Sequence, residues 1–145
     1  MTSVKTTVNS KDYYTYSVCR GTFDATYLAN EVKRISQMPG FKKNMNAIAN
    51  LIFCKYDTGK LVTQLKQYSE AIIPFVHKKG EHYKLAVVLP SVQAMADFSP
   101  YIAFSETLKM PFELRLFLDF SEVAKWFKFS KDAIERLQNI IERYR

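Results

Sequence analysis

Two apolar runs decide the fold of this chain: residues 46–54 read NAIANLIFC and residues 83–89 read YKLAVVL. Neither run alternates strictly between polar and apolar residues, as a strand with one wet face does. Continuous apolar runs of this length, bounded by turn residues such as Asp57 and Gly59, are typical of strands covered on both faces. The two runs therefore predict the centre of a parallel sheet with helices packed on it.

Outward from these runs, strand and helix signals alternate along the chain. Pro74 is expected to end or kink the second helix and leave residues 77–82 (HKKGEH) as a polar turn, and Pro100 is expected to kink the third. Residues 112–118 alternate between polar and apolar, which indicates a strand near an edge. The expected strands are 13–19, 46–54, 83–89 and 112–118, and the expected helices are 25–38, 61–75, 92–108, 119–127 and 130–145. This order predicts an α/β fold: a single-layer, mixed but mostly parallel sheet of four to five strands with flanking helices.

The length of 145 residues, with 48% hydrophobic and 24% charged residues, predicts one globular domain. Residues 1–11 are polar and without period, so we expect a flexible N-terminal tail, or at most a weak lead-in strand. Residues 12–145 then form the domain, with 130–145 as an extra C-terminal helix. No apolar run approaches the ~20 residues of a membrane span, and the N-terminus has no apolar signal region. A cytoplasmic protein is expected.

The net charge of +7 is a local property. Residues 33–79 hold nine bases and two acids, a surplus equal to that of the whole chain. Only one of the nine is Arg, the residue that dominates base recognition, and no nucleic-acid motif is present, which argues against nucleic acid as the partner. The alternative explanations of the basic segment are a solvated lysine face, an acidic protein partner, or peripheral contact with an anionic membrane surface.

A resemblance to a known family rests on several segments. Residues 117–127 (FLDFSEVAKWF) and 85–91 (LAVVLPS), together with Gly21 and the Pro39–Phe41 step, are similar to the pattern of SpoIIAA-like (STAS-like) small bacterial proteins. The resemblance covers roughly residues 13–127. It implies a fold related to anti-sigma-factor antagonists and, more distantly, to lipid-binding domains of the Sec14 (CRAL-TRIO) type. The chain departs from the family at Asn50, where an Asp is common, and at residues 99–101 (SPY), where an Arg is common.

The loop at residues 57–60 (DTGK) is a candidate anion site. In the anti-sigma antagonists, a Ser directly before a Gly at the start of the second helix accepts a phosphate, and the resemblance places Thr58 there. A phosphate at a helix N-terminus is favoured by free N–H groups and by the helix dipole. The cations expected to bind it, or to bind an acidic partner, are Lys42, Lys43, Lys55 and Lys60. The alternative is that Asp57 or Thr58 only caps the helix.

Catalysis and metal binding find little support in the sequence. Cys19 and Cys54 fall in expected strands, and His77 and His82 fall in the lysine-rich turn, which favours two buried thiols and two solvated imidazoles. No nucleophile motif, nucleotide-binding glycine loop or paired carboxylates occur. We therefore expect no enzyme activity, no metal and no cofactor.

The aromatic content, with 11 Phe, 9 Tyr and 1 Trp, keeps an apolar pocket in view. If the third helix kinks at Pro100, its aromatic side chains could line a cavity together with those around the last strand. The candidates for such a pocket are Phe98, Tyr101, Phe104, Phe117 and Trp126. The alternative is that the same side chains form a packed core.

From these observations we expect a non-catalytic, cytosolic binding or regulatory module that acts through protein contacts. The alternatives are a carrier of a small apolar or lipid-like ligand and a phospho-switch at Thr58. A homodimer is expected through an edge strand, or through the last helix if Ile134, Leu137, Ile141 and Tyr144 face a second chain rather than this one.

Overall fold

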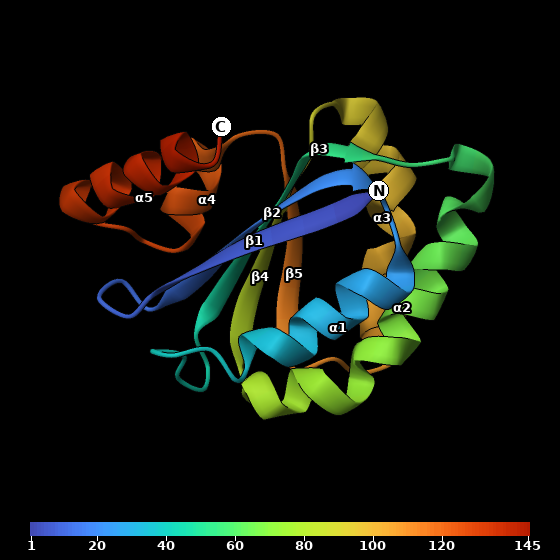
Figure 1. Cartoon of the computed structure of the whole chain (residues 1–145), viewed down its shortest axis with the longest axis horizontal. Coiled ribbons are helices and arrows are strands. Elements are labelled where there is room, and N and C mark those ends of the chain that lie inside the picture. The colour runs from blue at the N-terminus through green and yellow to red at the C-terminus, as the bar shows by residue number, and fades with distance from the viewer.

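The structure, a computed structural model, describes all 145 residues. It contains a five-stranded sheet and five helices (Figure 1). The strands are β1 (Thr2–Asn9), β2 (Tyr14–Thr22), β3 (Asn46–Lys55), β4 (Tyr83–Val88) and β5 (Phe112–Phe117). The helices are α1 (Ala25–Ile35), α2 (Thr58–Lys79), α3 (Val92–Thr107), α4 (Phe120–Trp126) and α5 (Lys131–Arg143). The predicted α/β class is confirmed.

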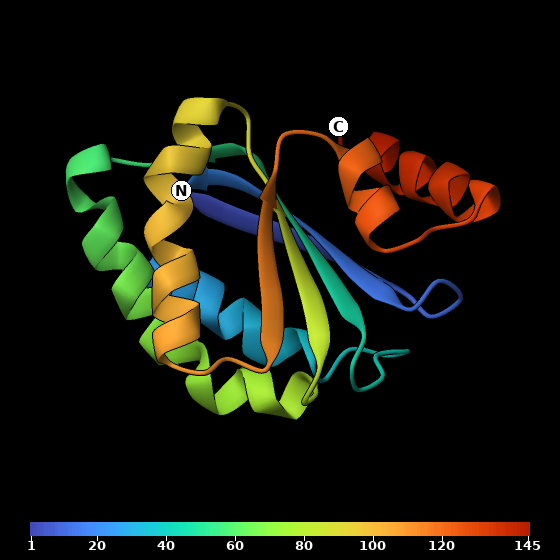
Figure 2. The same cartoon turned by 180° about the vertical axis from the view of Figure 1, so that it is seen from behind.

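The strands lie in chain order, β1-β2-β3-β4-β5, and only β1 is antiparallel to its neighbour. Each crossover from β2 to β5 therefore steps in the same direction along the sheet. Right-handed crossovers that step in one direction place their helices on one face. Accordingly α1, α2 and α3 cover one face, called here the first face, and α4 and α5 cover the opposite, second face (Figures 1 and 2). The predicted edge position of residues 112–118 is confirmed, because β5 ends the sheet.

The prediction of a flexible tail at residues 1–11 was wrong. Residues 2–9 form β1, which pairs with β2 from Thr2 opposite Gly21 to Asn9 opposite Tyr14. The segment TSVKTTVN is polar, but its Thr and Val residues are β-branched and suit a strand. An edge strand needs few large apolar side chains, because one of its flanks has no neighbouring strand and its residues are at most partly buried.

The polar turn predicted at residues 77–82 was also misplaced. Helix α2 continues through Pro74 and ends at Lys79. Pro74 and Glu70, whose carbonyl loses its helical donor, are both exposed, so water can replace the missing bond. Helix α3 likewise continues through Pro100, and there the Ser99 hydroxyl donates to the Ala96 carbonyl at 2.8 Å.

Each face of the sheet carries its own core. The first-face core includes Leu61, Leu65 and Ile72 of α2 and Phe98 of α3. The second-face core joins residues of the sheet to α4 and α5: Tyr14, Tyr16, Val18, Ile48, Ala86, Val88, Val123, Leu137 and Ile140. Helix α5 thus packs Leu137 and Ile140 against its own sheet.

Two contacts fix the position of α5. Arg136 donates to both carboxylate oxygens of Asp12, at 2.7 and 2.8 Å, and the Tyr144 hydroxyl lies 2.6 Å from that of Thr7. Both contacts join the end of the chain to its β1–β2 hairpin. Ile134 is the large apolar side chain of α5 that is left exposed, at 37%.

Candidate functional site

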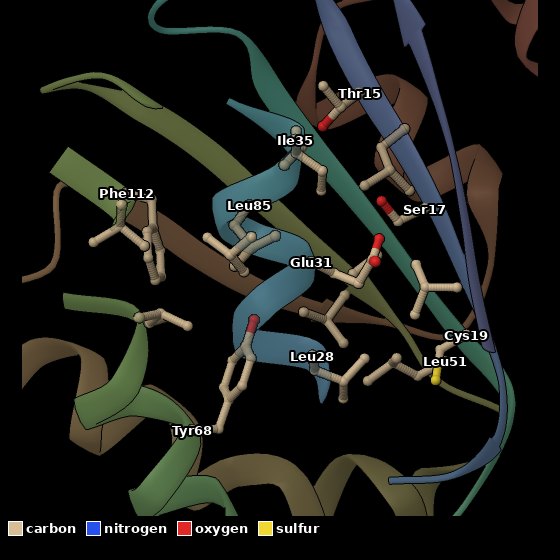
Figure 3. Close-up of a pocket in the computed structure, with 18 of the residues that line it drawn as sticks. Thr15, Ser17, Cys19, Leu28, Glu31, Ile35, Leu51, Tyr68, Leu85 and Phe112 are labelled. Carbon is tan, nitrogen blue, oxygen red and sulfur yellow. The ribbon is translucent and has the colours of Figure 1, made fainter. Parts of the chain in front are cut away.

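A mainly apolar cavity of about 110 Å³ lies between the first face of the sheet and helices α1, α2 and α3. Twenty of its 24 lining residues are hydrophobic. Figure 3 shows side chains from the strands and from α1 and α2 converging on it, among them Leu28, Tyr68, Leu85 and Phe112. Because Cys19 lies late in β2 and Phe112 begins β5, the cavity extends along the strands and across the sheet.

Small side chains at the centre of the sheet leave this space open. Ala47 and Ala49 of β3 point to the first face, between β2 and β4. Ala49 and Leu51, together with Leu85 of β4, keep intermediate exposure although they lie on central strands. Interiors are normally packed as tightly as organic crystals, so residual accessibility at these positions marks a packing gap.

Two charged residues line the cavity, and they differ in their partners. The Glu31 carboxylate accepts three hydrogen bonds from Arg34, one turn along α1, at 2.8, 3.0 and 3.2 Å. Lys79 is only 6% exposed and forms no ion pair. Its Nζ lies 5.3 Å from the ring centre of Tyr83. Burial lowers the pKa of Lys79 to about 8.

Hydroxyl groups supply the other polar atoms near the cavity, from Thr15 and Ser17 of β2 and from tyrosines of the helices. Burial raises the pKa of Tyr68 to about 12 and that of Tyr101 well above its usual value, so both stay protonated at neutral pH. The hydroxyls of Tyr101 and Ser105, both on α3, are buried without a hydrogen-bond partner. Such groups are uncommon in native interiors and commonly mark a place where water or a ligand belongs.

The two cysteines meet beside the cavity. Their Sγ atoms lie 3.6 Å apart, and both residues are buried as free thiols. A bulge brings them together, because Val18 pairs with Asn50 while Arg20 pairs with Phe53, which leaves one extra residue in β3. The contact with Cys19 and burial raise the pKa of Cys54, so this thiol stays protonated. The prediction of two buried thiols is confirmed.

Asn50, which stands where the resembling family often has Asp, has a structural task at this bulge. Its side-chain oxygen accepts from the Ile52 backbone at 3.0 Å, and its amide donates to the Tyr16 hydroxyl at 3.0 Å. Asn50 is 2% exposed and lies on the second face, away from the cavity. An amide can donate and accept at once, which this position requires.

The sheet divides the five predicted pocket residues. Phe98 and Tyr101 line the cavity, whereas Phe104 packs against the surrounding core without lining it. Phe117 and Trp126 lie on the second face, with ring centres 5.5 Å apart, and Trp126 also lies under the Arg115 guanidinium. The prediction of one pocket shared by all five was therefore wrong, because residues close in sequence around β5 fall on opposite faces.

The predicted anion site is divided in a similar way. Lys55, Thr58 and Lys60 are exposed at the carboxyl edge of the sheet, where α2 begins. Lys42 and Lys43 precede β3 and lie at the amino edge, and the ten residues of β3 span roughly 33 Å. Lys42 and Lys43 therefore cannot share a phosphate with Thr58. At the helix start Asp57 is the cap, since its carboxylate accepts from the Gly59 N–H at 2.9 Å.

The positive charge gathers mainly at the amino edge. Helices α1 and α2 both end there, and their last turns carry Lys33, Arg34, His77, Lys78 and Lys79. Bases near helix C-termini complement the negative end of the helix dipole. The acidic caps Asp24, Asp57 and Asp119 lie at the opposite edge, where helices begin. The local surplus thus has a structural cause in the two ends of the helices.

The sequence-based site missed Lys79. Expecting α2 to stop near Pro74 placed Lys79 in a solvated turn. The sequence signal for Lys79 is its helical spacing. The buried residues of α2 follow one another at intervals of three or four: Leu61, Leu65, Ser69, Ile72, Val76 and Lys79. Lys79 therefore occupies the last core position of the helix.

His77 and His82 line an open groove at the amino edge, together with Glu81 and Glu113. No cluster of three or more His, Cys, Asp or Glu side chains has a geometry that could hold a metal ion. None of the five helices combines the length and the apolar character needed to cross a bilayer.

Comparison with known proteins finds no family model and no curated protein that matches this chain.

Proposed function

We propose that this protein is a non-catalytic binding module that holds a small, mainly apolar molecule between the sheet and helices α1–α3. The observation that carries the proposal is the cavity of about 110 Å³ with its hydrophobic lining. This develops the carrier alternative, although the pocket lies on the first face and excludes Phe117 and Trp126.

The size of the cavity supports a ligand of about one ring or a short acyl chain. An engineered apolar cavity of about 150 Å³ in another protein stays dry and binds benzene. An unfilled cavity of 110 Å³ costs roughly 2–3 kcal/mol of stability, at about 24 cal/mol per Å³. A molecule that fills the space restores those contacts, which gives the native fold a reason to bind one.

The contacts of the reactive groups favour binding over catalysis. Cys19, the thiol that lines the cavity, has Cys54 rather than a histidine as its neighbour. Glu31 is held by Arg34 and so is poorly placed as a free base. The hydrogen bond to Cys54 lowers the pKa of Cys19, but this partner is a second thiol and not the base that activates nucleophiles in enzymes.

Native mass spectrometry of the chain purified from its own cells tests the proposal. We expect a mass above that of the polypeptide, released on denaturation. Ala49→Ile fills the cavity from β3 and should abolish the added mass, whereas Ala71→Ile, on an exposed position of α2, should keep it. A spectrum without added mass for the native chain, or an added mass retained by Ala49→Ile, contradicts the proposal.

A regulatory role through protein contacts is a second candidate, favoured by the carboxyl edge. Thr58 is exposed there and free of the capping task that Asp57 performs. Val92 and Leu118, which are 71% and 44% exposed, belong to the same edge. Phosphopeptide mapping tests the switch: phosphate on Thr58 supports it, and an unmodified Thr58 together with a Thr58→Ala strain that behaves as wild type contradicts it.

We include three further points in this proposal: a cytoplasmic location, formation of a dimer, and kinship with SpoIIAA-like bacterial proteins. Two unbonded thiols 3.6 Å apart suit a reducing compartment. With α5 packed on its own sheet, the edge strands β1 and β5 are the elements left for pairing with a second copy.

A further inference from the structure

The cavity has one unpaired cation at its amino-edge end. Helix α2 ends at Lys79 and β4 begins at Tyr83, so this part of the lining lies where the chain turns between them. Phe23 and Phe98 lie toward the opposite, carboxyl edge, because β2 ends and α3 begins there. The space is thus lined mainly by apolar side chains, with Lys79 at one end and with Thr15, Ser17 and the Arg34-bound Glu31 along its length.

The backbone around Lys79 is fixed. Its carbonyl accepts from the Asn44 N–H at 2.8 Å, and the Asn44 side chain accepts from the backbones of Glu81 and His82 at 2.8 and 3.1 Å. Gly80 turns the chain at φ 147°, and a Cβ there would lie 2.3 Å from the Asn44 side-chain oxygen. The Lys79 side chain is therefore held in the buried stripe of α2.

No acid of this chain neutralises Lys79. Glu31 is the one carboxylate that lines the cavity, and Arg34 already binds both of its oxygens. The Tyr83 ring provides a weak electrostatic contact at 5.3 Å. A charged group on a side chain that is only 6% exposed is costly without a counter-ion, and the groups that compensate it best are anions.

We propose that the ligand of the cavity is a small monocarboxylate with a short acyl chain or a single ring, whose carboxylate pairs with Lys79 while its apolar part lies along Ala49, Leu85 and Phe98. This inference rests on the proposed function. The lowered pKa of Lys79 fits a cation that lacks its partner, since a bound carboxylate favours the charged form.

Calorimetric titration with two matched probes, hexanoate and 1-hexanol, tests the ligand class. The native chain should bind hexanoate at least tenfold more tightly than 1-hexanol. Lys79→Met keeps most of the length of the unbranched side chain and removes its charge, so hexanoate should bind at least tenfold more weakly while 1-hexanol binds as well or better. Lys78→Met, at the exposed neighbouring position, should change neither affinity.

The outcomes separate the two claims. Binding of 1-hexanol with no preference for hexanoate, unchanged by Lys79→Met, overturns the carboxylate and leaves the apolar cavity in place. Failure of both probes to bind the native chain overturns the proposed function and the ligand class together. Retained 1-hexanol binding in Lys79→Met shows that the variant is folded.

Discussion

Lys79 is a core residue whose charge opposes folding. Its folded pKa of about 8 lies below the unfolded value of about 10.4, so the native state disfavours the proton. The part of the folding free energy that depends on the Lys79 proton is therefore fully present above the unfolded pKa, and it is lost as the pH falls through 8. Lys79→Met should raise the free energy of unfolding at pH 7 by on the order of 2–3 kcal/mol, measured by urea titration. A variant that unfolds at lower urea contradicts the burial of the ammonium.

Asp12 gives the same sign of pH dependence in the acid range, although here the native state favours the charged form. The Arg136 hydrogen bonds lower the pKa of Asp12 below its usual value. Its contribution to stability is thus present above the unfolded pKa of about 3.9 and is lost as the pH falls through the lower folded value. Asp12→Asn should flatten this acid loss in a series of thermal melts below pH 5. Asp132→Asn, at an exposed position of α5, should leave the profile of the native chain unchanged.

At the scale of elements, helix α5 stabilises the second face. Leu137 is 2% exposed in the second-face core, whereas Ile134 on the same helix is 37% exposed. Leu137→Ala should cost about 2–5 kcal/mol of unfolding free energy, and Ile134→Ala should cost far less. Urea unfolding at two protein concentrations checks this. Similar losses for both variants, or a midpoint that depends on concentration, would assign the α5 stripe to a second chain instead.

The sequence predicts most elements correctly, because periodicity and capping are local. The continuous runs of β3 and β4 and the caps Asp24 and Asp119 required no tertiary information. The end of α2 could not be predicted in this way. Pro74 is tolerated inside the helix because the hydrogen bond that it removes faces water, and this depends on the packing of α2. Strand β1 also needed tertiary information, since its polar segment is stabilised by pairing with β2.

The site was predictable only in part. Phe98 and Tyr101 were found because they belong to one helical stripe, but Phe117 and Trp126 were assigned to the wrong face. The sequence around Pro100 does not say which face of β5 each aromatic side chain meets. The bulge after Asn50, which brings Cys54 beside Cys19, depends on the register between two strands far apart in sequence.

At the scale of the molecule, the two faces of the sheet differ in packing. Ala49 adjoins the cavity on the first face, whereas Ala86 is 0% exposed in the second-face core. Ala49→Ile should leave stability unchanged or raise it by about 1 kcal/mol, since one added side chain fills part of the gap. Ala86→Ile should lose about 1–3 kcal/mol through overpacking. Equal losses in differential scanning calorimetry would show that both faces are filled.

The ends of the molecule differ in charge as the faces differ in packing. Helix starts with acidic caps lie at the carboxyl edge, and helix ends with bases lie at the amino edge. Lys79 is the base that this arrangement turns inward, to the cavity. The surplus of +7 is thus tied to both the surface and the proposed site.

The most direct measurement is an NMR titration of the methyl groups of the native chain with 1-hexanol. We expect saturable shifts confined to first-face methyls, such as those of Ala49, Leu85 and Val87, with Val88 and Leu137 on the second face unmoved. No saturable shift, or shifts spread over surface methyls such as Val62 and Val92, would contradict a ligand site between the sheet and α1–α3.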